Sequence, residues 1–502
     1  MSRGWWLDET EPTYFRRGHG RDRMPPRSPE SPVRSRTGHT DASNPNAEEN
    51  VEPKVPSWVG VATGVLAVSM ALTGAVIGVA FGNNNVLGAM IVVPVLFGIT
   101  AFIARRLATI DGNPIVFQMV MAGFFVKCAG VVVRYVVSFT LYGTSDATEY
   151  NIHGKQIARG LRHGELVSQG GHWAGTNFVR LLTGIVYTVG PMSKLAGFMV
   201  FGWFSYLGAL LFWRAYRKAI SDRNDLRYLQ WIVLLPTMAY WPSALGKDAW
   251  MVLCLGLAAY GVACILTTRP LLGWIAFSGG IAGVSEVRPH LGLSVVAGLV
   301  LAMLLRKWPT KGRFAALIAV GLVVIAGMVV VGQASHFLGV GVFSQKGVQK
   351  ELNDVQGRTG EGGSEFHPVP VHSPVQFPLA VVTVLFRPLP FEAHNPQSLL
   401  VSIEDVVLLS VLVVGRKRWL RAFRLSRSRP FVLYCVGAIS TFVIAYSSFS
   451  NFGLIARQRA QITPLLLVLL LFPKADEEAP EDEPSPPPKQ RGNFVPPAVR
   501  RP

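Results

Sequence analysis

Five short polar segments carry side chains that could bind a phosphate group and accept a proton, and each borders an apolar run. They are TSDATEYNIHGK at 144–155, WPSALGKD at 241–248, SEVRPH at 285–290, RPLPFEAHN at 387–395 and NFGLIARQRAQ at 451–461. Arginine presents forked, permanently charged donors that suit phosphate. Carboxylates suit proton acceptance or ligation of a hard metal ion. The combination predicts a site that binds an anionic substrate and acts on it.

These side chains divide into predicted roles. Asp146 and Glu392 are the predicted catalytic carboxylates, with Asp146 as the general base. The predicted phosphate-binding residues are Lys247, Arg288, Arg387, Arg457 and Arg459. The predicted supporting residues are Glu149, Tyr150, Asp248, Glu286, His290, His394, Lys127, Arg134 and Glu404. No cofactor is assigned, and a divalent metal ion on the carboxylates is an open alternative.

Several of these assignments have a structural alternative. Asp146 could serve as a helix N-cap, because SDATE fits a capping box. Glu392 could form a salt bridge with Arg387, and Arg288 could pair locally with Glu286. The two arginines of the segment 457–459 could extend their charges to the membrane interface.

Further charges lie within predicted membrane helices. Lys127 and Arg134 are about two helical turns apart, so they share one face. Glu404 and Asp405 lie about two turns inside a later helix. A charge at mid-bilayer costs about 2.5–3.5 kcal/mol on insertion scales, so such groups face a protein interior or a wet cavity. Lys127, Arg134 and Glu404 are therefore either a buried ion-pair set or the lining of a hydrated cavity.

The elements that must position these groups are membrane helices. The 502-residue chain is 50% hydrophobic and 16% charged, with a mean hydropathy of +0.34. Apolar runs of about 18 residues recur along it, which predicts an all-α, polytopic transmembrane helical bundle. The twelve predicted spans are 57–81, 86–103, 114–141, 192–213, 228–242, 249–267, 271–286, 291–306, 313–334, 398–415, 430–448 and 457–473. The runs 181–190 and 377–386 are too short to span, so we expect re-entrant or interfacial pieces there.

Basic residues determine the predicted orientation. Residues 416–429, RKRWLRAFRLSRSR, hold seven basic residues and no acid, and 214–227 and 306–313 are also basic. The positive-inside rule puts these segments in the cytoplasm, with both termini. Loops 142–191 and 335–397 then face outward, at the level that all five polar segments reach. Since basic loops explain much of the net charge of +18, nucleic-acid binding is not expected.

The spanning domain is predicted to cover residues 57–473. Residues 1–56 and 474–502 lack apolar periodicity and are rich in charged residues and proline, which predicts disordered cytoplasmic tails. The polar stretch 335–376 predicts a lid over the cavity entrance. The four cysteines lie in apolar stretches without metal-ligand spacing, so they are predicted core residues.

Three of the polar segments resemble bacterial multi-helix glycan-assembly proteins, a class that joins GT-C glycosyltransferases, which use polyprenyl-phosphate donors, and O-antigen-type polysaccharide polymerases. SDATEY, with Asp146 and Tyr150, is similar to the acidic motif in the first long outer loop of GT-C enzymes. WPSALGKDAW looks like the P-S-x-x-x-K-D/E turn before a helix in these proteins, and the RPH at 288–290 often accompanies it. GLIARQR, followed by Pro464, is similar to their G-x-x-x-R-x-R…P ending.

The resemblance covers residues 57–473 as scattered short motifs. It implies an enzyme of the bacterial cytoplasmic membrane that transfers sugar from a polyprenyl-linked donor to a glycan acceptor at the outer face, as a glycosyltransferase or a polysaccharide polymerase. This chain departs from the pattern in two ways. The acidic loop follows the third predicted helix, and Asp146 and Glu149 do not form an adjacent pair.

Two other functions remain open from the sequence. A transporter or flippase of lipid-linked or anionic substrates would also need cationic groups in the membrane, along the whole path to the cytoplasm. A non-catalytic membrane scaffold would use its tails to bind partners. The sugar, the acceptor and the linkage are not predicted.

Overall fold

The computed structural model describes residues 83–141, 145–165, 174–220, 225–267, 269–307, 321, 365–371, 373–393 and 395–474. Across these ranges the chain is helical, and a β-bridge joins Glu365 to Asn451. The predictions for both tails, for helix 57–81, for most of helix 313–334 and for most of the lid 335–376 lie outside the described residues, as does His394.

Five helices of the described chain are long and apolar enough to cross a bilayer. The five are α2 (Asn84–Asp111), α3 (Pro114–Val136), α6 (Lys194–Ala219), α9 (Lys247–Leu266) and α15 (Pro396–Val414). The count becomes six if α16 (Arg416–Leu425) and α17 (Pro430–Tyr446), which meet at a bend of 110°, form one span. A π-helical turn, Val137–Leu141, extends α3 to the predicted end of that segment.

The other described helices are shorter. They are α4 (Asp146–Arg162), α5 (Thr176–Val189), α7 (Asp225–Leu234), α8 (Pro236–Tyr240), α10 (Pro270–Ser285), α11 (Pro289–Leu305), α14 (Phe377–Phe386), α18 (Phe452–Arg459) and α19 (Thr463–Leu470). Two short 3₁₀ turns, Pro374–Gln376 and Pro390–Glu392, flank α14.

The predicted number of about twelve spanning helices is not confirmed in the described part of the chain. The predicted span 228–242 is broken into α7 and α8, and 457–473 is broken into α18 and α19. Each second piece carries a proline in its first turn, at Pro236 and Pro464, where the missing N–H cannot continue the preceding helix. The predicted spans 271–286 and 291–306 correspond to helices of 16 and 17 residues.

Contacts between helix ends define one end of the bundle, opposite the ends that carry the polar segments. Tyr216 on α6 donates a hydrogen bond of 2.8 Å from its hydroxyl to the Leu471 carbonyl after α19. Arg429, before α17, donates to the Ile220 carbonyl at the end of α6. The carboxyl ends of α6 and α19 and the amino end of α17 therefore lie at one level. We call this level the α16 end.

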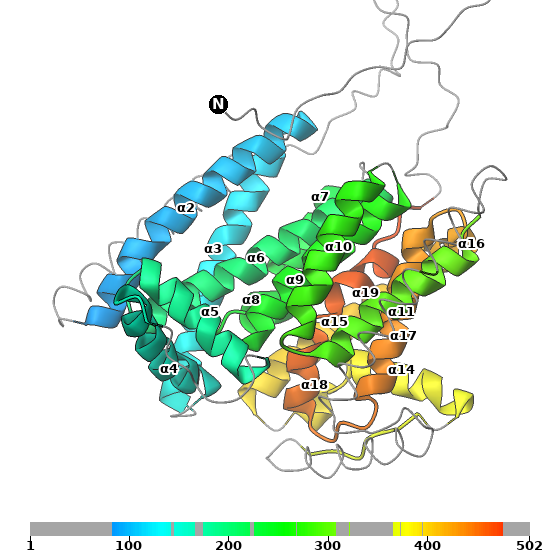
Figure 1. Cartoon of the computed structure of the whole chain (residues 1–502). Helices are drawn as coiled ribbons and strands as arrows, with labels where there is room; N and C mark the ends of the chain where they lie inside the picture. Colours follow the sequence, from blue (N-terminus) through cyan, green and yellow to red (C-terminus); the bar gives the residue numbers. More distant parts are fainter. Residues whose placement is uncertain are drawn as a thin grey trace, which may run out of the picture. The chain divides into compact units, whose positions relative to one another are not determined.

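Helix α9 packs between α6 and α10, and the three run side by side (Figure 1). Glycine permits the closest approach. A Cβ atom on Gly208 of α6 would lie under 3.0 Å from the Val252 backbone of α9, and a Cβ on Gly256 would meet the Gly208 backbone. Small residues at such crossings let helix backbones meet without clashes in a bilayer. This contact fixes α9, whose amino end carries Lys247 and Asp248.

Replacing Gly208 with leucine tests this packing. We expect Gly208→Leu to lower the free energy of unfolding by about 1–3 kcal/mol, because the side chain must push α9 away from α6. Thermal unfolding of the purified protein in detergent measures the change. Gly279→Leu is the control, because a Cβ there lies 3.7 Å from its nearest neighbour, Leu257. Equal melting temperatures for the two variants would contradict the packing argument.

Candidate functional site

Asp248 is a buried carboxylate that two arginine side chains hold. It lies in the first turn of α9, where the helix dipole favours a negative charge. Its Oδ1 accepts a hydrogen bond of 2.9 Å from Arg288 Nη1, and its Oδ2 accepts one from Arg457 Nε. Gln461 Nε2 donates to Oδ1 at 3.3 Å. The Asp248 side chain is 7% exposed, so these charges interact largely shielded from bulk water.

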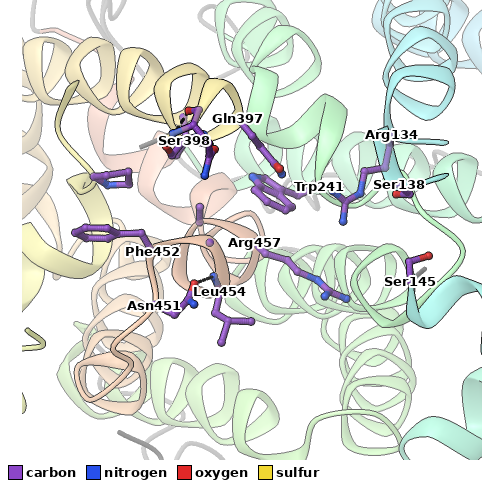
Figure 2. A pocket seen from close by; sticks show the side chains of 15 residues that line it. Arg134, Ser138, Ser145, Trp241, Gln397, Ser398, Asn451, Phe452, Leu454 and Arg457 are labelled. Atoms are coloured by element: carbon purple, nitrogen blue, oxygen red, sulfur yellow. Dashed lines mark hydrogen bonds between the residues drawn. The ribbon is translucent and has the colours of Figure 1, made fainter. Parts of the chain in front are cut away.

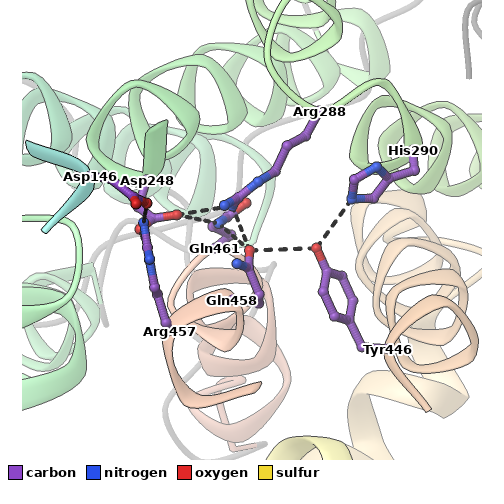
Figure 3. A network of polar contacts seen from close by, with 8 residues as sticks. All are labelled: Asp146, Asp248, Arg288, His290, Tyr446, Arg457, Gln458 and Gln461. Atoms are coloured by element: carbon purple, nitrogen blue, oxygen red, sulfur yellow. Dashed lines mark hydrogen bonds and ion pairs between the residues drawn. The ribbon is translucent and has the colours of Figure 1, made fainter. Parts of the chain in front are cut away.

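Gln458 extends this cluster toward α17. Its Oε1 accepts hydrogen bonds from Arg288 and from Gln461 Nε2, the latter at 2.9 Å. The Tyr446 hydroxyl lies 3.5 Å from the same oxygen and 3.3 Å from His290 Nε2 (Figure 3). The last two contacts are longer than ordinary hydrogen bonds and therefore weaker. The cluster joins the amino end of α11 to α18 and to the end of α17.

Arg457 connects the buried cluster to an accessible carboxylate. Its Nη2 lies 4.0 Å from Asp146 Oδ2, and the Asp146 side chain is 72% exposed. The Asp248 charge, which outweighs burial, raises the pKa of the Arg457 guanidinium above its ordinary value, and Asp146 adds to this effect. Arg457 is therefore a fixed cation with a buried carboxylate on one side and an accessible one on the other.

Two polar chambers adjoin Arg457. The large chamber has a volume of about 400 Å³, and the small chamber has a volume of about 180 Å³. Both are lined by Arg134, Ser138, Ser145 and Arg457. The small chamber also contains Asp146, Tyr150, Gly246 and Asp248, whereas Asn395, Ser398, Asn451 and Phe452 line the large chamber (Figure 2). Arginine from two distant segments thus lines both chambers.

An apolar groove of about 370 Å³ meets the large chamber. It runs between α3, α8 and α15, and Trp241, Asn395, Gln397 and Val401 line both the groove and the large chamber. The remaining groove residues are Val133, Val137, Pro236, Thr237, Tyr240, Leu400 and Glu404. Val133 is 52% exposed and Leu400 is 50% exposed. Because these two lie on candidate spanning helices, the groove opens on the side of the bundle that would face lipid tails.

Arg134 lies where the polar chambers and the groove come together. Its Nη1 donates a hydrogen bond of 2.9 Å to the Tyr240 hydroxyl. Its guanidinium carbon lies 4.8 Å from the centre of the Tyr240 ring and 5.0 Å from the Trp241 ring, distances typical of cation–π contacts. Its Nε is buried and has no hydrogen-bond partner. A positive charge with an unused donor therefore lies at this junction.

The described side chains fit an anion better than a metal ion. Within the described ranges, no group of three His, Cys, Asp or Glu side chains comes together in a way that could hold a metal. Asp248 already accepts from two guanidinium groups, and Arg457 lies between it and Asp146. A divalent cation there would be repelled by both arginines.

Glu392 is engaged within its own loop. Arg387 Nε donates to Glu392 Oε1 and Oε2 at 3.0 and 3.1 Å, and the Leu389 N–H donates to Oε2 at 2.8 Å. Burial alone would raise the pKa of Glu392, but these donors outweigh it and lower the pKa. Both carboxylate oxygens thus accept hydrogen bonds within the loop, as the salt-bridge alternative predicted, and Glu392 lines none of the three cavities described above.

Arg459, a predicted phosphate ligand, lies away from the chambers. Its Nη2 forms an ion pair of 2.7 Å with Asp405 Oδ1, and its Nη1 donates to the Arg387 carbonyl at 3.0 Å. The two paired side chains are 1% and 0% exposed. Arg459 therefore joins α18 to α15 and to the loop before it, and phosphate could not reach it without breaking a buried ion pair.

The charges within the candidate spanning helices contact α8 and do not pair with one another as the ion-pair alternative predicted. Lys127 Nζ donates to the Met238 carbonyl at 2.8 Å, and Arg134 contacts Tyr240. Glu404 Oε2 accepts a bond of 2.6 Å from the Thr237 N–H. That N–H lies in the first turn of α8, where no preceding helical carbonyl is available. Because both Lys127 and Arg134 reach α8, they lie on one face of α3, as their spacing predicted.

The other predicted residues divide between the chambers and the surface. Tyr150 is buried beside the small chamber, and Lys247 precedes Asp248 in the first turn of α9. Glu149 points to His153 and Arg180, at 3.2 and 3.5 Å. Glu286 is exposed. Asp146 begins α4, but Ser145 is its N-cap and makes no side-chain capping bond, so the predicted capping box is not formed.

Sequence reasoning missed several side chains of the site. Gln458 and Gln461 lay within the quoted segment 451–461, and their spacing of one helical turn from each other was an available signal. Trp241 and Asn395 are the first and last residues of the quoted segments 241–248 and 387–395, but nothing in their type or spacing indicated a groove. Asp405 was noted only for its depth, although it is the partner of Arg459.

Removing the Asp248 charge should destabilise the fold. We expect Asp248→Asn to lower the free energy of unfolding by about 3–5 kcal/mol, because Arg288 and Arg457 lose their buried counter-charge. Thermal unfolding in detergent gives the comparison. Glu149→Gln is the control and should stay within about 0.5 kcal/mol, since that side chain is 61% exposed. A stable Asp248→Asn protein would show that the arginines do not depend on this carboxylate.

The Glu392 loop should make stability depend on pH. Because its pKa is lowered in the folded state, its contribution is present above its unfolded pKa and is lost as pH falls through the folded value. We expect Glu392→Gln to lower the melting temperature at neutral pH and to lose less stability on acidification than the unaltered protein. If the melting temperatures of the two proteins fell equally as the pH was lowered, the Glu392 loop would not be the source of the pH dependence.

The chain was also compared with known proteins. No protein-family model matches it, and no curated protein or solved structure matches it.

Proposed function

We propose that the chain is an integral membrane glycosyltransferase or polysaccharide polymerase. Its substrates would be polyprenyl-phosphate-linked sugars at the outer face of a bacterial cytoplasmic membrane. The observation that carries this proposal is the junction of an apolar groove with a cationic chamber. A lipid-linked sugar phosphate has the same two parts, an apolar chain and an anionic head.

The apolar groove favours a substrate with a lipid part. Its lining is mostly apolar, and its rim at Val133 and Leu400 is exposed between two candidate spanning helices. An isoprenoid chain could therefore enter sideways from the bilayer without crossing polar surface. Because lipid tails are as apolar as the groove, van der Waals packing of the chain against the groove wall would favour binding.

Arg134 and Arg457 favour a substrate with a phosphate group. Both line the large chamber, and Arg134 also contacts the aromatic rings of the groove. A phosphate held there would receive forked guanidinium donors on the path from groove to chamber. Asp248 would position Arg457 through its ion pair.

Asp146 is the proposed general base. It lines the small chamber, which adjoins the large one at Arg134 and Arg457, so an acceptor hydroxyl there would lie beside the donor sugar. The acceptor oxygen would bond to the anomeric carbon as the bond from that carbon to the phosphate oxygen breaks. The hydroxyl proton would pass to the Asp146 carboxylate, and the lipid phosphate would leave with the bonding electrons, stabilised by both arginines.

A lipid flippase is the second candidate, since Glu404 gives the groove a carboxylate deeper in the membrane. A flippase would need charged groups along a path to the α16 end. The deeper charges Lys127, Asp405 and Arg459 contact protein groups and line none of these three cavities. This difference favours transfer over transport.

Transfer from a polyprenyl-phosphate sugar in reconstituted vesicles tests the proposal. We expect Asp146→Asn to lower the rate by about 10²–10⁴-fold while lipid-phosphate binding persists, because proton acceptance is lost and the arginines remain. Arg134→Gln should weaken lipid-phosphate binding itself.

Glu149→Gln is the matched control for Asp146→Asn, since it removes a charge from the same helix at a residue outside both chambers. We expect it to retain transfer. Movement of the lipid across the bilayer without a new glycosidic bond would favour the flippase. Unchanged transfer in Asp146→Asn would remove the assignment of the base.

A further inference from the structure

Helix α16 lies at the end of the bundle away from the chambers. It follows α15 after the single residue Gly415 and meets α17 at a bend of 110°. Arg418 and Arg421 donate from their guanidinium groups to the Phe472 and Pro473 carbonyls, at 3.0 and 3.1 Å. Since these carbonyls follow α19, α16 is held where that helix ends and cannot continue α15 through the bilayer.

The basic residues around α16 divide into two sets. Arg418, Arg421 and Arg429 donate to backbone carbonyls of other segments. The exposed set comprises Arg416, Lys417, Arg424 and Arg427. No acidic residue occurs between 416 and 429. The exposed charges of this segment are therefore all positive, although much of its basic charge contacts backbone carbonyls inside the protein.

Apolar side chains lie between the exposed cations. Leu420 and Phe423 are 40% and 45% exposed. Arg416, Leu420, Phe423 and Arg427 are spaced by four, three and four residues, so they follow one face of the helix and the turn after it. Amphipathic helices with this mixture lie in the plane of a membrane, with apolar groups at the acyl boundary and cations at the headgroups.

The chain leading into α16 indicates what covers this face. Val413 and Val414, the last residues of α15, are 59% and 85% exposed. Two exposed valines at the end of a candidate spanning helix belong in hydrocarbon, and the cations begin two residues later. The exposed face of α16 is thus continuous with the lipid-facing surface of α15 at the depth where phosphate headgroups begin.

We propose that α16 is a binding surface for anionic phospholipid headgroups, in which Arg416, Lys417, Arg424 and Arg427 contact phosphates while Leu420 and Phe423 insert beside them. The occupant is the lipid of the leaflet on this side, because the surface matches its charge and adjoins its acyl region. The proposal concerns the end opposite the chambers and does not depend on the proposed transfer reaction.

The test uses the full chain in neutral detergent, with phosphatidylglycerol as the probe and phosphatidylcholine for comparison. Native mass spectrometry measures how much of each lipid remains bound. We expect replacement of all four exposed basic residues by glutamine to weaken phosphatidylglycerol retention at least tenfold, with phosphatidylcholine unchanged, because anionic lipid attraction scales with nearby basic residues. Retention by the unaltered protein should also fall with added salt.

Two further variants make the result specific. Lysine at Arg416, Arg424 and Arg427 should preserve retention, since charge is kept. Glutamine at Arg105 and Arg106, two exposed basic residues of α2, should change retention less than twofold. Equal phosphatidylglycerol retention by the fourfold glutamine variant and the unaltered protein would overturn the proposal. So would an equal loss in the α2 control, which would indicate attraction by general charge.

Discussion

The buried Asp248 carboxylate is the interaction on which the candidate site depends. Two guanidinium groups from distant segments could not lie close together without a shared counter-charge, because their repulsion increases as water is excluded. Asp248 supplies that charge from the amino end of α9, where backbone N–H groups also favour an anion. Because glycine contacts fix α9 against α6, the position of Arg457 is set by a rigid helix pair.

Broken helices then create the space around this charge cluster. The break before Pro236 frees the Thr237 N–H, which Glu404 accepts, and leaves α8 as a short wall between α3 and α15. The break before Pro464 leaves α18 as a short helix beside the chambers, and the Thr463 hydroxyl donates at 2.9 Å to the Arg459 carbonyl at the end of α18. Polar side chains thus satisfy backbone groups that a continuous helix would have satisfied itself, as backbone in a membrane requires.

Helical periodicity predicted the features that depend on a single segment of the chain, namely where a helix lies and which side chains share its face. The span 114–141 and the common face of Lys127 and Arg134 follow from apolar runs and spacing, and the structure has both. Pairing between segments was not predictable in the same way. Arg457 and Arg459 are two residues apart and therefore point about 200° away from each other around the helix axis. The sequence does not reveal which of these two arginines faces a chamber. That depends on the positions of their carboxylate partners, Asp248 for Arg457 and Asp405 for Arg459.

Arginine side chains therefore have different roles at the two ends of the bundle. Near the chambers, Arg288 and Arg457 bind a buried carboxylate, which keeps permanent charges in a shielded position beside open space. Around α16, arginines satisfy carbonyls that end helices or face outward between apolar side chains. A high net positive charge alone predicts neither arrangement. An arginine beside a cavity is suited to substrate binding when a carboxylate or aromatic rings hold its guanidinium, as at Arg457 and Arg134. A basic residue outside such a setting serves orientation, capping or contact with lipid.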